Sequence, residues 1–173
     1  MVNTHGERQV APGRLESVRT LLNSWWIPNQ TRVAEDRFDA YADEHHVATS
    51  ERARLRELRD DLRRVVDRSA PADAVVNRWI AELDVKPHVA AESVGFWHAA
   101  GRCGDVLVAS LAAMSLGQWT RLKACPDCQW VFYDHSRNAS KRWCLMTAGG
   151  PDGRSCGSIA KVRAYRARAR QSA

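Results

Sequence analysis

Apolar residues recur at helical spacing through the first part of the chain, where they are interleaved with charged positions. A first helix is predicted from Leu15 to a break at Pro28 and Asn29, and a second from Thr31, a residue type that caps helix N-termini, to His45. The apolar faces of these helices consist of Leu15, Val18, Leu22 and Trp25 in the first and Ala34, Phe38, Tyr41 and His45 in the second. The pattern favours a helical fold for this part of the chain.

Two further helices and a short strand are predicted downstream. One helix opens at Ser50, and its six arginines are balanced by four acids, so we interpret them as a solvated face on which Asp60 and Arg64 pair. The next helix starts near Pro71, and residues 85–91 form a short strand. The apolar positions are Leu55, Leu58, Leu62 and Val65 in the first of these helices and Val76, Trp79, Ile80 and Leu83 in the second.

Residues 105–119 form a nearly continuous apolar run, which predicts a helix buried on most of its sides in the middle of a core. After Thr120 the composition changes from helix formers to cysteine, arginine, glycine and aromatic residues. We therefore predict a helical domain over residues 1–120 and a second domain over residues 121–173. The first is long enough to build its own core, whereas the second needs an additional stabilising element.

Composition places the chain among ordinary globular proteins, with 45% hydrophobic and 27% charged residues. No stretch approaches the roughly 18 uninterrupted apolar residues of a membrane helix. The first residues also lack the basic and apolar pattern of an export signal. We therefore expect a cytoplasmic protein that has no membrane partner.

Charge is distributed unevenly along the chain. Residues 1–120 carry 15 basic and 17 acidic side chains, a net of −2, whereas residues 121–173 carry 11 and 3, a net of +8. Of the 26 basic residues 22 are arginine, a side chain that binds phosphate and guanine in bidentate fashion. A basic end beside a mildly acidic larger part favours binding of that end to a polyanion such as DNA.

Four of the five cysteines lie in the basic segment, with the spacing C-x2-C-x15-C-x11-C. The CPDC turn points two thiolates at one ion, and the two later cysteines complete the tetrahedral set that suits Zn²⁺, so we predict one structural zinc per chain. A redox-active CxxC and unrelated thiols are the alternatives, while a cytoplasmic location argues against disulfides. The predicted ligands are Cys125, Cys128, Cys144 and Cys156.

Local patterns around these cysteines predict the shape of the segment. Alternating residues on both sides of the CPDC turn indicate a short hairpin, and the run after Cys156 indicates a basic helix with the last ligand at its N-terminus. The predicted fold is therefore mainly α, with a small C-terminal finger of the treble-clef or zinc-ribbon kind. Its aromatic residues are expected to fill the core of the finger rather than to stack on bases; they are Trp130, Phe132, Tyr133 and Trp143.

The runs CPDC and WVFYDHSRNASKRWC, followed by a Cys-Gly pair and a basic helix, resemble the zinc finger of the CGNR family. Members of that family are presumed bacterial transcription regulators in which a mainly helical ABATE domain precedes the finger. The resemblance covers about residues 121–168 and implies the same four zinc ligands and a DNA-binding role. This chain departs from the family in two places, since Ser158 and Ile159 replace Asn and Arg and the loop before the last ligand is longer.

Seven residues of the finger are predicted to contact DNA as partners of phosphates or bases. They are Arg137, Asn138, Lys141, Arg142, Arg163, Arg166 and Arg170. The helical domain is expected to bind a small-molecule effector or to form a homodimer. A polar loop that contains two indoles supplies the candidate effector ligands Asn23, Trp26, Asn29 and Arg32. In the competing interpretation, Trp25 belongs to the core and Trp26 covers an edge.

An enzymatic role is not expected. Four thiolates leave a zinc ion no open position for water, and the chain contains no nucleotide-binding glycine loop or catalytic triad. Cys103 is interpreted as a buried thiol, and the pair His45 and His46 as a solvated helix end. The alternative to a DNA-binding regulator is a protein-interaction module whose finger docks on another protein without binding nucleic acid.

Overall fold

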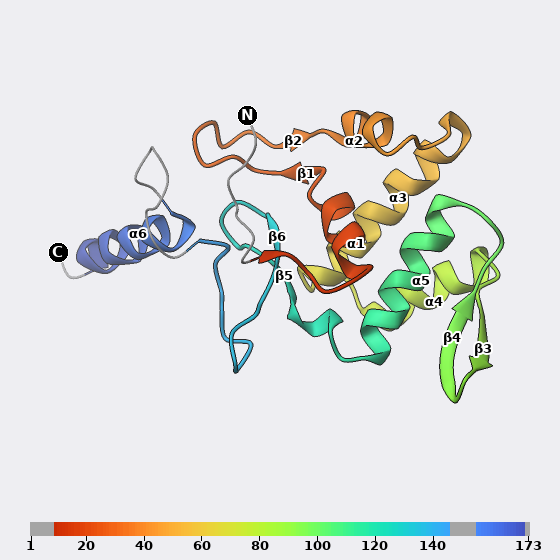
Figure 1. The fold of residues 1–173 in the computed structure, drawn as a ribbon. Coiled ribbons are helices and arrows are strands. Elements are labelled where there is room, and N and C mark those ends of the chain that lie inside the picture. The colour runs from red at the N-terminus through yellow and green to blue at the C-terminus, as the bar shows by residue number, and fades with distance from the viewer. Residues whose placement is uncertain (1–8, 146–154, 172–173) are drawn as a thin grey trace.

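A computed structural model describes residues 9–145 and 155–171 of the chain. The helices in these ranges are α1 (Leu15–Leu22), α2 (Phe38–Glu44), α3 (Thr49–Val66), α4 (Ala72–Glu82), α5 (Arg102–Ser115) and α6 (Cys156–Gln171), with a short 3-10 turn η2 (Trp119–Arg121). The strands are β1 (Trp25–Trp26), β2 (Glu35–Asp36), β3 (Lys86–Ala90), β4 (Ser93–Trp97), β5 (Leu122–Ala124) and β6 (Val131–Tyr133). Figure 1 shows α1, α3, α4 and α5 gathered on one side of the molecule and α6 projecting from the other.

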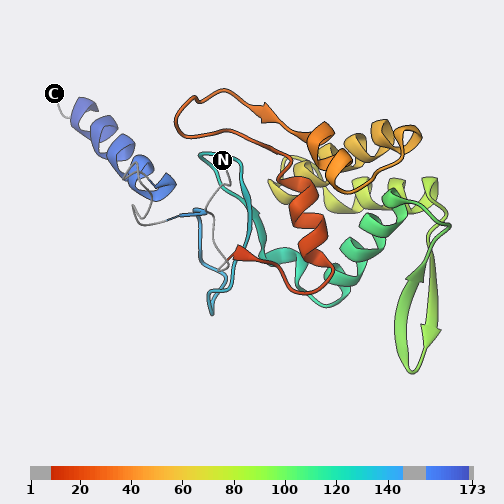
Figure 2. The same cartoon turned by 45° about the horizontal axis from the view of Figure 1, so that its top comes forward.

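The core lies where α1, α3 and α5 pack on one another (Figures 1 and 2). Leu22, Leu58 and Leu107, one from each helix, are completely buried there. The predicted apolar run is confirmed as α5, which buries residues on most of its sides. The helix ends at Ser115, however, and Trp119 follows in η2 as a separate buried residue.

The segment after α1 is extended rather than helical, which corrects the first predicted helix. α1 ends at Leu22, and Trp25–Trp26 pair with Glu35–Asp36 as antiparallel strands. The amide of Ile27 donates to the carbonyl oxygen of Cys128 at 2.8 Å. This contact with a distant part of the chain holds the segment extended, so tertiary structure outweighs the local helical pattern.

The start of α2 also differs from the prediction. Thr31 caps no helix, because α2 begins seven residues later at Phe38. At that point the carboxylate of Asp36 accepts the Phe38 amide at 2.9 Å and supplies the hydrogen bond that a capping side chain provides.

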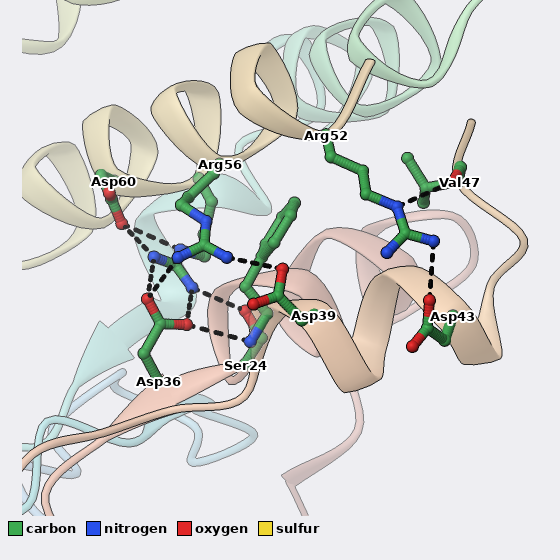
Figure 3. A network of polar contacts seen from close by, with 10 residues as sticks. Ser24, Asp36, Asp39, Asp43, Val47, Arg52, Arg56 and Asp60 are labelled. Atoms are coloured by element: carbon green, nitrogen blue, oxygen red, sulfur yellow. Dashed lines mark hydrogen bonds and ion pairs between the residues drawn. The ribbon is translucent and has the colours of Figure 1, made fainter. Parts of the chain in front are cut away.

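The arginines of α3 are not a uniformly solvated face, and this interpretation was wrong for two of them. Arg59 and Arg63 are buried, with 2% and 8% of their surfaces exposed. The guanidinium of Arg59 donates two hydrogen bonds, of 2.7 and 3.0 Å, to the carboxylate of Asp36. Figure 3 shows Asp36 facing the helix that carries Arg56 and Asp60. Arg64 pairs with Asp61, three positions earlier, instead of with the acid four positions earlier. The partner of Arg59 was therefore set by tertiary structure, whereas Arg64 has a local one.

The other helices and the strand agree with the prediction. α3 begins at Thr49, α4 begins directly after Pro71, and β3 lies within residues 85–91. The partner of β3 was not predicted; β4 pairs with it in antiparallel register, Lys86 opposite Trp97. Figures 1 and 2 both show this hairpin projecting from the helices.

The predicted hairpin around the CPDC turn is formed by β5 and β6, with Leu122 opposite Tyr133 and Ala124 opposite Val131. Leu122, Val131 and Tyr133 belong to the same apolar cluster as the helices. β5 packs on α3 and β6 on α1. The hairpin and the helical part therefore share one core, and the division into domains at residue 120 stays a prediction.

Among the described residues, none of the helices combines the length and the apolar character that crossing a membrane requires.

Candidate metal centre

The four predicted ligands meet at one point of the structure. Cys125 and Cys128 lie in the turn between β5 and β6, Cys144 follows the next loop, and Cys156 is the first residue of α6. Their sulfur atoms all lie within 4.8 Å of one another, and Cys144 Sγ is 3.5 Å from both Cys128 Sγ and Cys156 Sγ. Sulfurs bound tetrahedrally to Zn²⁺ at about 2.3 Å would be roughly 3.8 Å apart. The arrangement therefore fits one zinc ion.

All four thiols are buried and none forms a disulfide. Hydrogen bonding from neighbouring thiols, that of Cys128 first, lowers the pKa of Cys125. The hydrogen bond with Cys125 raises the pKa of both Cys128 and Cys144. So many sulfurs in one buried space cannot all ionise without a compensating cation, and a divalent metal supplies that charge. A two-cysteine redox site does not account for four converging sulfurs.

The turn that carries the first two ligands is tight. The Cys125 amide donates to the carbonyl of Trp130 at 2.9 Å, and the Gln129 amide donates to the carbonyl of Cys125 at 2.8 Å. Gln129 adopts a left-handed backbone conformation, with φ of 59°. This reversal points both cysteine side chains to the inside of the turn.

The last ligand lies at the N-terminus of a helix, as predicted, and this helix is capped. The Ser158 amide donates to Ser155 Oγ at 3.1 Å, and the Ser155 amide donates to Ser158 Oγ at 3.0 Å. This reciprocal pair is the hydrogen-bond pattern of a capping box, with serine in place of the usual Glu or Gln. Ser158, one of the two departures from the family motif, therefore has a structural role next to Cys156. The longer loop, at residues 147–154, lies outside the described residues.

The N-terminal part of the chain contributes directly to the surroundings of the metal ligands. The side-chain amide of Asn29 donates to Cys156 Sγ at 3.2 Å. Arg32 donates to the carbonyl of Asp127 at 3.1 Å and lies 3.4 Å from its buried carboxylate. Such outer contacts orient ligands and stabilise thiolate charge. The loop between β1 and β2 thus supports the metal centre.

The residues predicted to bind an effector all contact the finger. Besides Asn29 and Arg32, Asn23 bonds both the amide and the carbonyl of Val131, at 2.7 and 2.8 Å. Trp26 packs edge-on against Trp130, with ring centroids 5.9 Å apart. The structure thus brings these four side chains together as supports of the finger, and their role in effector binding stays a prediction.

The aromatic residues of the finger mainly fill space, in line with the prediction. Phe132 is completely buried among the cysteines, and Tyr133 is buried in the larger core. Trp130 and Trp143 are partly buried and pack against the cysteine cluster.

A buried carboxylate that the sequence reasoning missed organises the loop after β6. Asp134 is completely buried and accepts hydrogen bonds from Lys123 Nζ at 2.7 Å, from Ser136 Oγ at 2.6 Å and from the amide of Lys141 at 2.8 Å. Burial alone would raise the pKa of Asp134, but the Lys123 and Ser136 hydrogen bonds lower it to about 2. Arg121 fastens the same loop by donating to the carbonyls of Asp134 and Ser136. The run DHSRNASK is the only local signal for this arrangement.

The predicted DNA-contacting residues lie in two places, this loop and α6. In the loop Arg137 and Asn138 are exposed, Lys141 lies over the Phe132 ring, and Arg142 lies over the Trp143 ring. On α6 the side chains of Arg166 and Arg170 are exposed, whereas Arg163 pairs with Asp127 at 2.8 Å. Whether any of them contacts DNA stays a prediction.

A site of four converging cysteines on a hairpin and a helix defines a small zinc finger. Residues 121–169 match the family model of the CGNR zinc finger. The resemblance seen in the sequence is therefore confirmed for this segment, and its four cysteines are the site of one structural zinc ion. A search of curated proteins finds no match to the chain.

Proposed function

We propose that this protein is a zinc-stabilised, DNA-binding transcription regulator whose finger contacts DNA and whose helical part receives an effector or a partner. The observation that carries the proposal is the exposed basic surface of the finger. α6 has five basic residues and no acid, and it projects away from the helical part (Figures 1 and 2). Exposed cationic side chains such as Arg166 and Arg170 supply the phosphate contacts on which DNA affinity depends.

The zinc ion in this proposal has a structural role. Four thiolates complete its tetrahedral shell, so it offers no position for an activated water, and we infer no enzymatic activity at this site. The ion holds the hairpin and the start of α6 together in the manner of a treble clef. Five unpaired cysteines are in keeping with a reducing compartment such as the cytoplasm.

The two basic elements complement each other in this role. An α-helix fits the major groove, so α6 is the element that we assign to it, with Arg166 and Arg170 as contacts. The loop held by Asp134 presents Arg137 and Asn138 in a fixed geometry, which lowers the entropic cost of binding. If about five phosphates are neutralised, the logarithm of affinity should fall with the logarithm of salt at a slope of roughly −4 to −5.

The deciding experiment reverses two charges of the finger. Arg142→Glu with Arg166→Glu should abolish binding to a mixed duplex DNA at physiological salt while the zinc content stays at about one per chain. A control with the same change in charge, Arg14→Glu with Lys86→Glu, alters exposed side chains outside the finger and should bind DNA nearly as the wild type does. Equal DNA binding by the two double variants would refute the proposal.

A protein-interaction module is the second candidate. It is favoured by two exposed apolar side chains on α6, Val162 and Tyr165, with 49% and 69% of their surfaces exposed. Apolar groups on a projecting helix suit a protein surface better than a phosphate backbone. Binding to heparin without binding to DNA or RNA at physiological salt would support this second candidate over the first.

A further inference from the structure

A second site is suggested by a cleft on the helical part. The cleft lies between α3, α4 and the turn of the zinc finger and has a volume of about 1010 Å³. Its charged lining comprises the arginines Arg59, Arg63, Arg64 and Arg78 and the acids Asp36, Glu57, Asp60, Asp61 and Asp67. Trp25 and Gln129, the latter in the turn of the finger, also line the cleft.

Most of these charges neutralise one another. Arg59 pairs with Asp36 and Asp60, and Arg78 pairs with Asp61. Glu57 and Arg64 also have partners of opposite charge in the cleft. Two charged groups differ from these in that, among the described residues, neither forms an ion pair: they are Arg63 and Asp67.

Arg63 is held without a carboxylate. Its guanidinium donates to the carbonyls of Leu22 and, at 2.8 Å, of Gln129, and it lies 4.5 Å from the centre of the Trp25 ring. Burial and the nearby charge of Arg59 lower the pKa of Arg63 to about 10. The charges of Asp60, Asp67 and Asp36 act in the opposite direction but do not outweigh burial, and none of these acids forms an ion pair with Arg63. An anionic group that bound directly to this guanidinium in the cleft would therefore compensate its charge further.

Asp67 occupies a position where an acidic side chain is unfavourable. It is the residue at the C-terminal end of α3, where the helix dipole disfavours an acid. Its carboxylate accepts the amide of Ser69 at 2.8 Å, a bond that an asparagine oxygen can replace. Residues that break a local rule without a structural gain concentrate at functional sites.

We propose that this cleft binds a small zwitterion of the amino-acid class, with its carboxylate at Arg63 and its ammonium group at Asp67. The two residues are four positions apart and therefore lie on the same side of the end of α3. Opposite charges at neighbouring points of one cleft match the two charges of such a ligand. The lining has four arginines against five acids, and this net negative charge disfavours phosphates and nucleic acids, which carry more than one negative charge.

The position of Arg63 connects this ligand to the metal centre. The carbonyl that accepts its hydrogen bond belongs to Gln129, the residue after the ligand Cys128. A carboxylate that draws the guanidinium toward the cleft weakens this contact with the turn of the finger. The regulatory consequence rests on the proposed function, whereas the binding itself does not.

The test uses the full-length, zinc-loaded protein without DNA. Thermal shift with each of the twenty common amino acids at millimolar concentration, followed by calorimetric titration of any that shifts, should find at least one ligand. Acetate, methylamine and inorganic phosphate serve as probes that carry only one sign of charge, and they should bind at least tenfold more weakly. No binding by any amino acid, or equal binding by acetate or phosphate, would overturn the proposal.

Substitutions in the cleft test whether the amino acid binds there, and the melting temperature of each variant shows whether its fold is intact. Asp67→Asn should lower the affinity for the amino acid by about tenfold, in line with loss of one charge pair. It should not lower the melting temperature of the free protein. Glu92→Gln makes the same change on the β3–β4 hairpin and should leave the affinity unchanged. Arg63→Lys, which keeps the charge and loses the planar guanidinium, should also weaken binding. Unchanged affinity in both cleft variants would place the ligand elsewhere.

Discussion

Two arginine-rich helices of this protein differ in what surrounds their charges. α3 carries six arginines among four acids, and further acids reach it from α2; Arg52 binds Asp43 at 2.6 Å and Arg56 binds Asp39 at 2.7 Å (Figure 3). α6 carries four arginines and a lysine and contains no acid.

The difference shows how one residue type serves two purposes. Most charges of α3 are paired inside the molecule, where they connect α3 to β2, α2 and α4. On α6 the pair of Arg163 with Asp127 connects the helix to the finger, while Arg166 and Arg170 extend into solvent. Arginines that pair with an internal acid stabilise the fold, whereas exposed arginines such as Arg166 and Arg170 are available to a partner.

Removing the metal should have the largest effect, and it should affect α6 but not α3. Binding of a structural zinc ion contributes on the order of 10 kcal/mol to folding. Cys144→Ser, or chelation of the wild type, should abolish protection of α6 against hydrogen exchange while α3 stays protected. Acidification should release the metal as well, because the thiolates take up protons.

Cys103→Ser is the control for this experiment, because Cys103 lies in α5, where burial raises the pKa of its thiol to about 11. It should keep one zinc per chain. Persistence of α6 protection in the metal-free protein would contradict the structural role of the ion.

Removing a buried arginine of α3 that pairs with a carboxylate should have the next largest effect. Arg59→Met leaves Asp36 without its main cation and should lower the free energy of unfolding by about 3 kcal/mol, a value reduced because Asp36 is partly exposed. Arg54→Met, on the exposed side of the same helix, should cost less than about 1 kcal/mol. Urea denaturation measures both, and equal losses would contradict the distinction between buried and exposed arginines.

Asp134→Asn should have an intermediate effect, within the finger itself. The lowered pKa of Asp134, about 2 against an ordinary 3.8, corresponds to a contribution of about 2 kcal/mol. This contribution is complete above a pH of about 4 and is lost as the pH falls through about 2, so the difference from the wild type should shrink over that range. DNA affinity should also fall while zinc is retained.

Asp73→Asn, on the exposed start of α4, is the matched control for this substitution. It should leave both the unfolding free energy and DNA binding nearly unchanged. If Asp134→Asn changed stability and DNA binding as little as Asp73→Asn does, the carboxylate of Asp134 would not hold the loop.

Replacing an arginine on α6 should have the smallest effect on stability. Arg166→Ser should change the free energy of unfolding by less than about 0.5 kcal/mol, as expected for an exposed site. The same variant should reduce the salt slope of DNA binding by about 1, because one phosphate contact is lost. A large loss of stability in this variant would remove the contrast between the two helices.

Much of the fold could be predicted because its signals are local. The periodic apolar positions of α3, α4 and α5 and the strand near Pro87 depend only on residues close in sequence. The spacing and chemistry of four cysteines likewise predicted the metal centre, because a tetrahedral set of thiolates in such a pattern suits a zinc ion.

The remainder depended on partners that are distant in sequence. Residues 25–36 are not helical because Ile27 and Arg32 bond to the turn that carries Cys128, about a hundred positions later, and Asn29 bonds to Cys156 at the start of α6. Arg63 is buried because carbonyls from both ends of the chain converge on it. A short stretch of sequence shows the helical periodicity of these segments, but it does not show which distant residues they contact.

The sequence by itself thus determined the identity of the metal ligands, the main helices and the sign of the charge on the finger. Only the tertiary structure decided which arginines are buried, which side chains support the metal centre and where an open cleft lies. The physical reason is that ligand chemistry and helix periodicity belong to short stretches of chain, whereas burial and charge pairing depend on which distant stretches meet.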